Sequence, residues 1–365
     1  MRVLHLEAGT HLYGGALQAL LLVEGLQARG VESVLVVPQG SEVESEAIRR
    51  NLSLHPLPMA GEADLRFPAR FRSLIKSVSP DLVHLHSRRG ADTLGGLGAR
   101  WAGVPVIMTR RVDNPEAEWS LAAKYRLFDR VITISHAIRK VLIRQGVDPE
   151  KLTCVHSALD PGPYSKPCNP GFFKSEFGGD EDGPCVGMAA QFIPRKGHDV
   201  LLEAIPSILL DHPRARFLLF GKGPLHGEIT EKIREAGLGD SVTLPGFRED
   251  LPAILPCLDL LVHPALMEGL GVVLLQAGAS GVPTVASAVG GIPEAVVHDQ
   301  TGLLVPAGNP GALALAVSEL LANPEKARSL GEQARERMRS HFSVDRMVEG
   351  NLKVYRELVS DTAEG

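Results

Sequence analysis

The segment that decides the fold spans residues 263–293 and reads HPALMEGLGVVLLQAGASGVPTVASAVGGIP. No residue from Gly269 to Pro293 is charged, a composition that a membrane-spanning helix could share. Glycine and proline divide the run, however, at Gly278, Gly281, Pro283, Gly290 and Gly291. The pattern favours a buried strand at 259–263, a helix from about 269 to 280 and a strand at 283–287, as in a parallel sheet.

The loop after the first of these strands combines a carboxylate with a helix start. Loops at the carboxyl ends of parallel strands commonly bind ligands. The helix start offers backbone N–H groups to a phosphate at Gly269, Leu270, Gly271 and Val272. Glu268 beside them would repel a phosphate, so a ligand with both phosphates and hydroxyls fits best. Glu268 and Gln276 lie eight positions apart, which is about 12 Å along a helix and matches a pyrophosphate with a sugar at each end.

Three motifs in this segment resemble the signature of the retaining GT-B glycosyltransferases of the group-4 type. The chain reads EGLGVVLLQ at 268–276, GVPTVAS at 281–287 and GGIPE at 290–294. The family has Glu-x7-Glu, Gly-x-Pro-x-(Val/Ala)-(Ala/Ser) and Gly-Gly-(Ile/Leu)-Pro-Glu. The resemblance implies that Glu268 holds hydroxyls of a donor sugar and that position 276 holds the nucleotide ribose. The chain departs from the family at Gln276, where the family has glutamate.

Length and composition fit two domains and a reduced protein. The 365 residues are 44% hydrophobic, enough for two sizeable cores. Residues 1–165 carry 20 Lys and Arg against 17 Asp and Glu, which indicates either an anionic partner or ordinary solvated charge, and we expect no nucleic-acid partner. The four cysteines lack CxxC or zinc spacing, and no apolar signal segment follows Met1 and Arg2. We therefore expect a reduced, cytoplasmic protein.

Short apolar strands alternate with helical stretches in both halves, which predicts an α/β protein of two doubly wound Rossmann-like domains. Strands are expected at 3–6, 33–37, 52–57, 81–85, 105–108, 130–134 and 152–156, and again at 185–190, 215–220, 241–244, 259–262, 283–286 and 302–305. Helices are expected at 15–29, 68–78, 310–322, 324–341 and 344–359, and a linker at 160–183. The domains are predicted at 1–165 and 166–342. The resemblance to the GT-B fold implies that they face each other across a cleft and that residues 343–365 cross back to the first domain.

Glycine turns after three strands resemble nucleotide-binding loops of the family. Residues 9–16 read GTHLYGGA; this is neither a Gly-x-Gly-x-x-Gly nor a Walker motif, so by itself it is equally typical of a plain turn. The resemblance implies that Gly14 and Gly15 close over the donor phosphates. The turn that contains Gly221 and Gly223 lacks the third glycine and the acidic residue of a dinucleotide-binding site. It resembles the loop that lies beside the nucleotide in the family. The loop GFRED at 246–250, with Phe247, resembles the one that receives the base.

Two adjacent cations follow the first strand of the second half. Lys196 before Gly197 matches the family's Lys-Gly, whose lysine grips the donor diphosphate. Gln191 stands where the family has an arginine, and Arg195 is an added cation. Cations at a strand end suit a pyrophosphate whose charge grows as the glycosidic bond breaks. A surface pair without function is the alternative.

The first half offers acceptor-side candidates at two strand ends. His86 closes the run DLVHLH at 81–86, and His84 points to the same face, so either could be a structural histidine. The next strand leads into Arg110 and Arg111, and many relatives have a histidine at the position of Arg111. Either guanidinium suits a phosphate or an anionic acceptor. A structural ion pair, with Asp113 or Glu116, is the alternative.

Two segments suggest other ligands. Residues 66–76, RFPARFRSLIK, combine four cations with apolar residues at helical spacing. This is typical of a helix on an anionic membrane surface, or of one that packs on a sheet, which we favour. Residues 180–182, DED, resemble a metal-binding Asp-x-Asp but lie in the predicted linker, so we expect neither a metal nor another cofactor.

Together with the resemblance, these features predict a metal-independent glycosyltransferase that uses a nucleoside-diphosphate sugar. The resemblance implies that it is a retaining enzyme and that its acceptor is a glycan or a lipid-linked molecule. Glu268 is predicted to orient the sugar, and Lys196 and Arg195 to stabilise the departing diphosphate. The resemblance implies bacterial envelope polysaccharide or lipopolysaccharide synthesis, with peripheral contact at the inner membrane surface. The departures at positions 191, 111 and 276 leave two alternatives, a nucleotide-sugar epimerase on the same fold and a non-catalytic nucleotide-sugar-binding protein.

Overall fold

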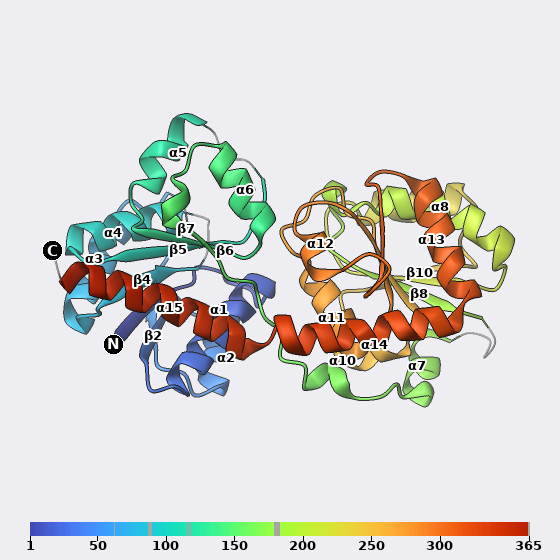
Figure 1. Cartoon of the computed structure of the whole chain (residues 1–365), viewed down its shortest axis with the longest axis horizontal. Helices are drawn as coiled ribbons and strands as arrows, with labels where there is room; N and C mark the ends of the chain where they lie inside the picture. The colour runs from blue at the N-terminus through green and yellow to red at the C-terminus, as the bar shows by residue number, and fades with distance from the viewer. Residues whose placement is uncertain (62, 87–89, 115, 117, 179–182, 364–365) are drawn as a thin grey trace. The chain divides into compact units, whose positions relative to one another are not determined.

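The computed structural model describes residues 1–365 except 62, 87–89, 115, 117, 179–182 and 364–365 (Figure 1). The acidic run at 180–182 therefore lies outside the described residues. The chain forms two compact units, one made of Met1–Ala158 with Val344–Gly365 and the other of Leu159–Ser343. The segment expected to be a linker belongs to the second unit, where it includes η3 (Pro163–Ser165) and α7 (Pro170–Phe177).

The first unit is built on a seven-stranded parallel sheet with the order β3-β2-β1-β4-β5-β6-β7. Its strands are β1 (Arg2–Leu6), β2 (Glu32–Pro38), β3 (Leu54–Leu57), β4 (Leu82–Leu85), β5 (Val106–Arg110), β6 (Arg130–Thr133) and β7 (Leu152–Cys154). All of the strands expected in this half are present, with bounds that differ by at most two residues. Nearly continuous apolar runs identify them because both faces of such a sheet are covered.

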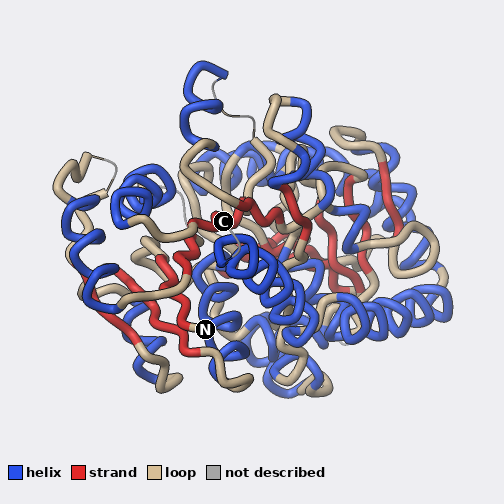
Figure 2. The backbone as a smooth tube through the Cα atoms, turned by 60° about the vertical axis from the view of Figure 1, so that its left-hand side comes forward, coloured by secondary structure: helices blue, strands red, loops and turns tan. Residues whose placement is uncertain are grey.

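Alternate residues of these strands pack into separate cores on the two faces of the sheet, and helices cover both faces (Figures 1 and 2). Leu4 and Leu6 pack on one side, with α3 (Phe67–Val78), η1 (Ala91–Gly95), α4 (Gly96–Ala102), α5 (Glu118–Tyr125) and α6 (His136–Arg144). Val3 packs on the other, with α1 (Gly14–Gln27) and α15 (Val344–Ala363), and α2 (Glu42–Arg49) also packs on α1. The apolar stripe of α3 is buried in the first core, which confirms the favoured interpretation of 66–76 as a helix that packs on the sheet.

The second unit contains a six-stranded parallel sheet with the order β10-β9-β8-β11-β12-β13. Its strands are β8 (Cys185–Ala189), β9 (Arg216–Phe220), β10 (Val242–Gly246), β11 (Leu260–His263), β12 (Thr284–Ser287) and β13 (Leu303–Val305). Its helices are α8 (His198–Asp211), α9 (His226–Glu235), α10 (Leu251–Ile254), α11 (Val272–Ser280), α12 (Ile292–Ala295), α13 (Pro310–Ala322) and α14 (Pro324–His341). Short turns are η2 (Pro149–Lys151) in the first unit, and η4 (Pro194–Lys196) and η5 (Leu255–Cys257) in the second. Within the described part of the chain, the structure has no helix whose length and apolarity would suffice to cross a bilayer.

A disulfide joins Cys168 to Cys257 within the second unit. The expectation that all four cysteines are reduced is therefore wrong for this pair. The two residues are 89 positions apart in sequence, but the fold brings their Cα atoms to 4.8 Å, within the range that a disulfide needs. Sequence spacing carries no signal for a pair that only the tertiary fold brings together.

Candidate functional site

The predicted site residues follow the strands at which each sheet reverses its order. The reversals lie between β1 and β4 in the first unit and between β8 and β11 in the second. Doubly wound sheets bind ligands beside the carboxyl ends of strands at such a point. Lys196 and Glu268 follow β8 and β11, and Gly14 and His86 follow β1 and β4. The topology therefore gathers these residues at the edges where ligands bind.

Glu268 is the centre of the arrangement in the second unit. Its Oε2 accepts a hydrogen bond from Lys196 Nζ at 2.5 Å and lies 2.9 Å from His263 Nε2. The carboxylate is largely buried, with 12% of the side chain exposed. Burial would raise the pKa of Glu268, but the hydrogen bond with His263 and the charge of Lys196 outweigh it and hold that pKa well below its usual range. Glu268 is therefore an anion at neutral pH.

A close approach of two loops places Lys196 beside Glu268. The backbone N–H of Leu266 donates to the carbonyl oxygen of Arg195 at 2.8 Å. Gly197 has a φ of 74°, and a Cβ at this position would lie 1.9 Å from the carbonyl oxygen of Pro264. Only glycine permits this conformation and this approach without strain. The Lys-Gly motif thus serves the contact with the end of β11.

Two histidines beside this pair were missed by the motif analysis. His263 ends β11, and its Nδ1 is buried without a partner among the described residues. His198 opens α8 with both ring nitrogens buried and, again within the described part, without partners. Burial lowers the pKa of His198 to about 4, so its ring is neutral near pH 7. The only sequence signal for His263 was its place at the carboxyl end of a predicted strand.

Gln276 lies on α11, where its Nε2 donates a hydrogen bond to the hydroxyl oxygen of Tyr164 at 2.7 Å. Tyr164 belongs to η3, in the segment predicted as a linker, and no motif drew attention to it. Its side chain is buried, and burial raises the pKa of Tyr164 to about 12. The predicted ribose residue thus has a neutral phenol as its partner.

The remaining donor-side candidates of the second unit lie in the loops after β11 and β10. Helix α11 begins at Val272, later than predicted, because Gly271 caps it with a left-handed φ of 86°. The N–H of Gly269 donates to Glu268 Oε1 at 3.2 Å. Phe247 follows β10 with 49% of its surface exposed, and Lys222 Nζ lies 4.6 Å from its ring centroid. An exposed ring of this kind offers a flat apolar face to a nucleotide base.

The glycine turn after β9 is packed tightly against the loop after β8. A Cβ at Gly221 would lie 1.9 Å from the carbonyl oxygen of Ala190, and one at Gly223 would lie 2.5 Å from that of Phe192. These glycines therefore have a packing role in the structure, whatever they bind.

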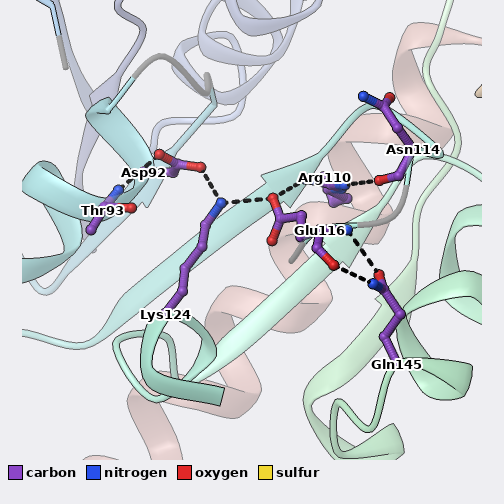
Figure 3. Close-up of polar contacts among 7 residues, drawn as sticks. All are labelled: Asp92, Thr93, Arg110, Asn114, Glu116, Lys124 and Gln145. Atoms are coloured by element: carbon purple, nitrogen blue, oxygen red, sulfur yellow. Dashed lines mark hydrogen bonds and ion pairs between the residues drawn. The ribbon is translucent and has the colours of Figure 1, made fainter. Parts of the chain in front are cut away.

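Arg110 and Arg111 have different environments in the first unit. Arg110 is buried, and its guanidinium donates to Glu116 Oε1 at 2.5 Å and to the carbonyl oxygen of Asn114 at 2.6 Å (Figure 3). Lys124 Nζ extends this network, at 2.8 Å from Glu116 and 2.5 Å from Asp92. Of the two alternatives for Arg110, the structure shows the ion pair with Glu116.

Arg111 lies against the start of α1. Its Cδ would be 3.5 Å from a Cβ at Gly15, and its Nε is buried with no partner in the described part of the chain. Burial lowers the pKa of Arg111 to about 10, which leaves the guanidinium charged at neutral pH. A cation beside a helix N-terminus is an arrangement that attracts anions. The acceptor-side role of Arg111 stays a prediction.

His86 belongs to a buried cluster and does not reach solvent, contrary to its interpretation as a cleft residue. Its Nε2 lies 2.9 Å from His5 Nδ1, while His84 bonds through its two nitrogens to Tyr355 Oη and Thr109 Oγ1, each at 2.6 Å. His84 and His86 share a face, as their spacing predicts, but α15 covers that face. The ligand atoms of the three rings lie within 4.8 Å, yet both nitrogens of His84 are already bonded, so we describe the cluster as a hydrogen-bonded core network.

A small cavity of about 120 Å³ opens beside the loop after β1. Its walls include Ala8, Thr10, Met59, Asp64, Phe67 and Leu94. The carboxylate of Asp64 is already paired with Arg70 at 2.5 Å. Most of the other side chains that line the cavity are apolar. No sequence pattern indicated this cavity, because its walls come from segments that are far apart in the chain.

Comparison with known proteins gives matches in both units. Residues 13–162 match the model described as Glycosyltransferase Family 4, and residues 172–337 match Glycosyl transferases group 1. Alpha-maltose-1-phosphate synthase of Mycolicibacterium smegmatis is 31% identical over 340 residues, which cover 83% of this chain and 87% of that protein. A GDP-mannose-dependent alpha-(1-6)-phosphatidylinositol monomannoside mannosyltransferase of Mycobacterium tuberculosis is 36% identical over 162 residues, and the chain spans only 42% of the length of that relative, with 42% of this chain covered.

The arrangement of strands and helices also matches a solved structure. The crystal structure of Anabaena Alr3699/HepE in complex with UDP superimposes with a TM-score of 0.86 at 19% identity, covering 98% of this chain and 100% of that one. At this identity the likeness concerns the fold.

Proposed function

Because the chain belongs to the group-4 glycosyltransferases and has their GT-B fold, we propose that it transfers a sugar from a nucleoside-diphosphate sugar to an acceptor hydroxyl, with retention at the anomeric carbon. The observation that carries the proposal is the contact of Lys196 with Glu268 at a reversal of strand order. A nucleotide sugar needs a cation for its diphosphate and an acceptor for its hydroxyls. This pair supplies both.

In the proposed reaction, the donor separates Lys196 from Glu268 and binds to both. The ammonium of Lys196 donates hydrogen bonds to the phosphate oxygens of the donor. The carboxylate oxygens of Glu268 then accept hydrogen bonds from hydroxyls of the sugar. The bond between the anomeric carbon and the phosphate oxygen breaks, and its electron pair leaves with the diphosphate. Lys196, Arg195 and the N-terminus of α11 stabilise that growing charge. The acceptor oxygen bonds to the anomeric carbon on the same face, and its proton passes to the departing phosphate.

The acceptor that we propose is a glycan or lipid-linked molecule with a phosphate or another anionic group. Support comes from Arg111 beside the start of α1. It also comes from the relatives, since maltose 1-phosphate and phosphatidylinositol monomannoside both contain phosphate. A lipid-linked acceptor would bring the chain to the inner membrane surface, in envelope polysaccharide or lipopolysaccharide synthesis. Side-chain cations supply the charge at the diphosphate, so the proposed reaction uses no metal or other cofactor.

The proposal is tested by incubating the protein with UDP-, GDP-, ADP- and TDP-sugars, with and without sugar phosphates and phospholipid-linked sugars. We expect one donor to release its nucleoside diphosphate slowly alone and rapidly with an acceptor, and NMR to show the anomeric configuration retained. Glu268→Gln serves as the inactive control. Interconversion of the donor sugar would identify an epimerase, and binding without turnover would identify a sensor; either result would replace the proposal.

A further inference from the structure

We propose that Tyr164 is a positioning residue for donor recognition, which fixes the orientation of the Gln276 amide toward the nucleotide ribose, and that the disulfide between Cys168 and Cys257 holds Tyr164 in place. This inference rests on the proposed function, and it concerns a tyrosine that lies outside all of the motifs quoted above.

The first observation is the direction of the hydrogen bond between the two side chains. Gln276 Nε2 donates to Tyr164 Oη at 2.7 Å. An amide has one donating and one accepting end, so the end left for a ligand is the carbonyl oxygen. Gln276 is only half-buried in the structure. Gln276 is thus prepared to accept a hydrogen bond from a ribose hydroxyl.

The surroundings of Tyr164 are compatible with this direction. The phenol is 8% exposed and stays neutral, because burial and the charge of Asp160 together raise the pKa of Tyr164 to about 12. A neutral phenol keeps both its hydroxyl proton and its oxygen lone pairs. The lone pairs of the phenol oxygen are then free to accept from Gln276.

The chemistry of position 276 explains why such a partner matters in this chain. The two oxygens of a glutamate are equivalent acceptors, so a carboxylate reads a ribose diol in either orientation. A glutamine that rotates by half a turn presents its NH₂ group in place of its oxygen. A fixed partner for the NH₂ group removes that ambiguity, and Tyr164 is this partner.

The second observation is the covalent support of the segment that carries Tyr164. Tyr164 lies in the short turn η3, which contacts α10 and α11, and Cys168 follows a few residues later. The disulfide joins this segment to Cys257, at the end of η5 and just before β11. Strand β11 in turn ends at His263, which bonds to Glu268. Closing this long loop limits the freedom of the segment, and it ties Tyr164 to the strand that leads to the sugar site.

The test compares Tyr164→Phe in two backgrounds, the wild type and Gln276→Glu, by calorimetric Kd for the nucleoside diphosphate and by KM and kcat for the donor. In the wild type we expect Tyr164→Phe to raise Kd and KM about fivefold, which corresponds to one hydrogen bond, with kcat unchanged. With Gln276→Glu the same change should have little effect, because either carboxylate oxygen accepts. Equal losses in both backgrounds, or no loss in the wild type, would overturn the positioning role.

Matched controls separate positioning from general damage. Tyr125→Phe removes a buried phenol hydroxyl from the first unit, and it should leave the nucleotide Kd unchanged. Melting curves of all of the variants show whether Tyr164→Phe remains folded. If Tyr125→Phe weakened nucleotide binding as much as Tyr164→Phe, the assignment to Tyr164 would be lost.

The disulfide is tested with dithiothreitol and with Cys168→Ser. Each should raise the nucleotide Kd by about the factor found for Tyr164→Phe, and neither should add to that variant, since non-additivity marks residues that act through one another. Cys154→Ser, which leaves the disulfide intact, is the control. An unchanged Kd after reduction would overturn the role of the disulfide.

The outcomes also distinguish this inference from the proposed function. If the wild type binds a nucleoside diphosphate with the expected response to Tyr164→Phe but transfers no sugar, the proposed function fails and the inference stands. If sugar transfer is found but Kd does not respond to Tyr164→Phe, only the inference fails. A wild-type protein that binds none of UDP, GDP, ADP and TDP would overturn both.

Discussion

Lys196 and Glu268 form a largely buried ion pair with each other at 2.5 Å, so in the proposed reaction a donor would have to exchange that contact for new ones. Removing one member of a buried ion pair leaves the other without compensation, which costs stability as well as function. Changes in rate at either position are therefore informative only beside a melting curve. The same holds for Arg110 in its network with Glu116.

Lys196→Ala should lower kcat/KM for sugar transfer by about two to three orders of magnitude, because one clamp on developing phosphate charge contributes about 3–4 kcal/mol. Arg195→Ala should lower it less. The control is Lys232→Ala, since Lys232 is an exposed lysine of the same unit that pairs with Asp199 and Glu228 and such surface pairs contribute little. Steady-state kinetics with the identified donor measures the difference. Wild-type activity in Lys196→Ala would contradict the phosphate role.

Arg111→Ala should affect acceptor binding, whereas Arg110→Ala should affect the stability of the fold. Arg111→Ala should raise the acceptor KM about tenfold or more, since a charge-assisted hydrogen bond contributes about 1.5–3 kcal/mol, while hydrolysis of the donor alone is unchanged. Arg110→Ala should lower the free energy of unfolding by about 3–5 kcal/mol, because it removes a fully buried partner of Glu116 and leaves only Lys124 to compensate that carboxylate. Kinetics and chemical denaturation of both variants test this. The roles are assigned wrongly if the two effects are exchanged.

At the scale of single residues, the sequence predicted members of the candidate site only where they belong to a local sequence pattern. Lys196 precedes a glycine, and Glu268 opens a glycine-flanked helix start, so both could be predicted. Tyr164 contacts Gln276 across more than a hundred residues of sequence, and no local pattern encodes such a contact. The exchange of Glu for Gln at 276 was visible, whereas the partner that orients the amide was not.

Among the elements, α1 and α15 approach each other closely at Gly25. A Cβ at Gly25 would lie 2.5 Å from Val348 Cγ2, and a β-branched valine has little freedom to turn away. Both helices bury leucines in a shared core. The glycine is thus required by packing, in spite of its low helix propensity.

Gly25→Ala should lower the free energy of unfolding by about 1–3 kcal/mol, the usual cost of overpacking. The matched control is Gly227→Ala in α9, where a new Cβ meets nothing within 4 Å. That change should be neutral or stabilise by up to about 1 kcal/mol through helix propensity. Urea denaturation of both variants measures the contrast. Equal stabilisation by the two changes would show that the helices can separate at no cost.

The histidine cluster should make the first unit sensitive to acid. Burial lowers the pKa of His5 to about 3 and lowers those of His84 and His86 well below the usual value. In the unfolded chain each has a pKa of about 6.5, so below that pH the unfolded chain binds protons that the folded cluster does not. The stability contributed by the neutral rings is fully present above about pH 6.5, and it falls with pH by about 1.4 kcal/mol per unit for each histidine.

Denaturation between pH 7 and 5 should therefore show the first unit losing stability steeply, and His5→Asn should reduce that slope. His55→Gln, which changes an exposed histidine, is the control and should leave the slope as it is. A slope unaffected by His5→Asn would rule out the cluster as its source.

The elements themselves were largely predictable, and their ends less so. Apolar runs marked the strands because both faces of a parallel sheet are buried. The start of α11 was placed too early, since the left-handed conformation of Gly271 begins the helix only at Val272. The disulfide was not predicted because no local sequence pattern around Cys168 indicates that it pairs with Cys257.

For the whole molecule, the proposed chemistry predicts that sugar transfer survives EDTA. In the proposed site Lys196 and Arg195 would supply the positive charge at the diphosphate, so no divalent ion would be needed to neutralise it. Transfer rates before and after dialysis against EDTA measure this. Complete loss that Mg²⁺ or Mn²⁺ restores would refute it.

Composition and alternation were enough to predict two α/β domains, since each alternating set makes one sheet. They could not assign the segment after Ala158, because its proline and glycine content looks like a linker, while η3, α7 and the disulfide make it part of the second unit.

The first unit consists of two pieces of chain, Met1–Ala158 and Val344–Gly365, with all of Leu159–Ser343 between them. The ribosome synthesises the two pieces in that order. The leucines of α1 that pack against α15 therefore remain uncovered until the entire second unit has been synthesised. An incomplete core of this kind exposes apolar surface on the nascent chain, which is what chaperones bind. The second unit is contiguous and can finish folding first. The half of the protein that leaves the ribosome first is therefore the last to be completed.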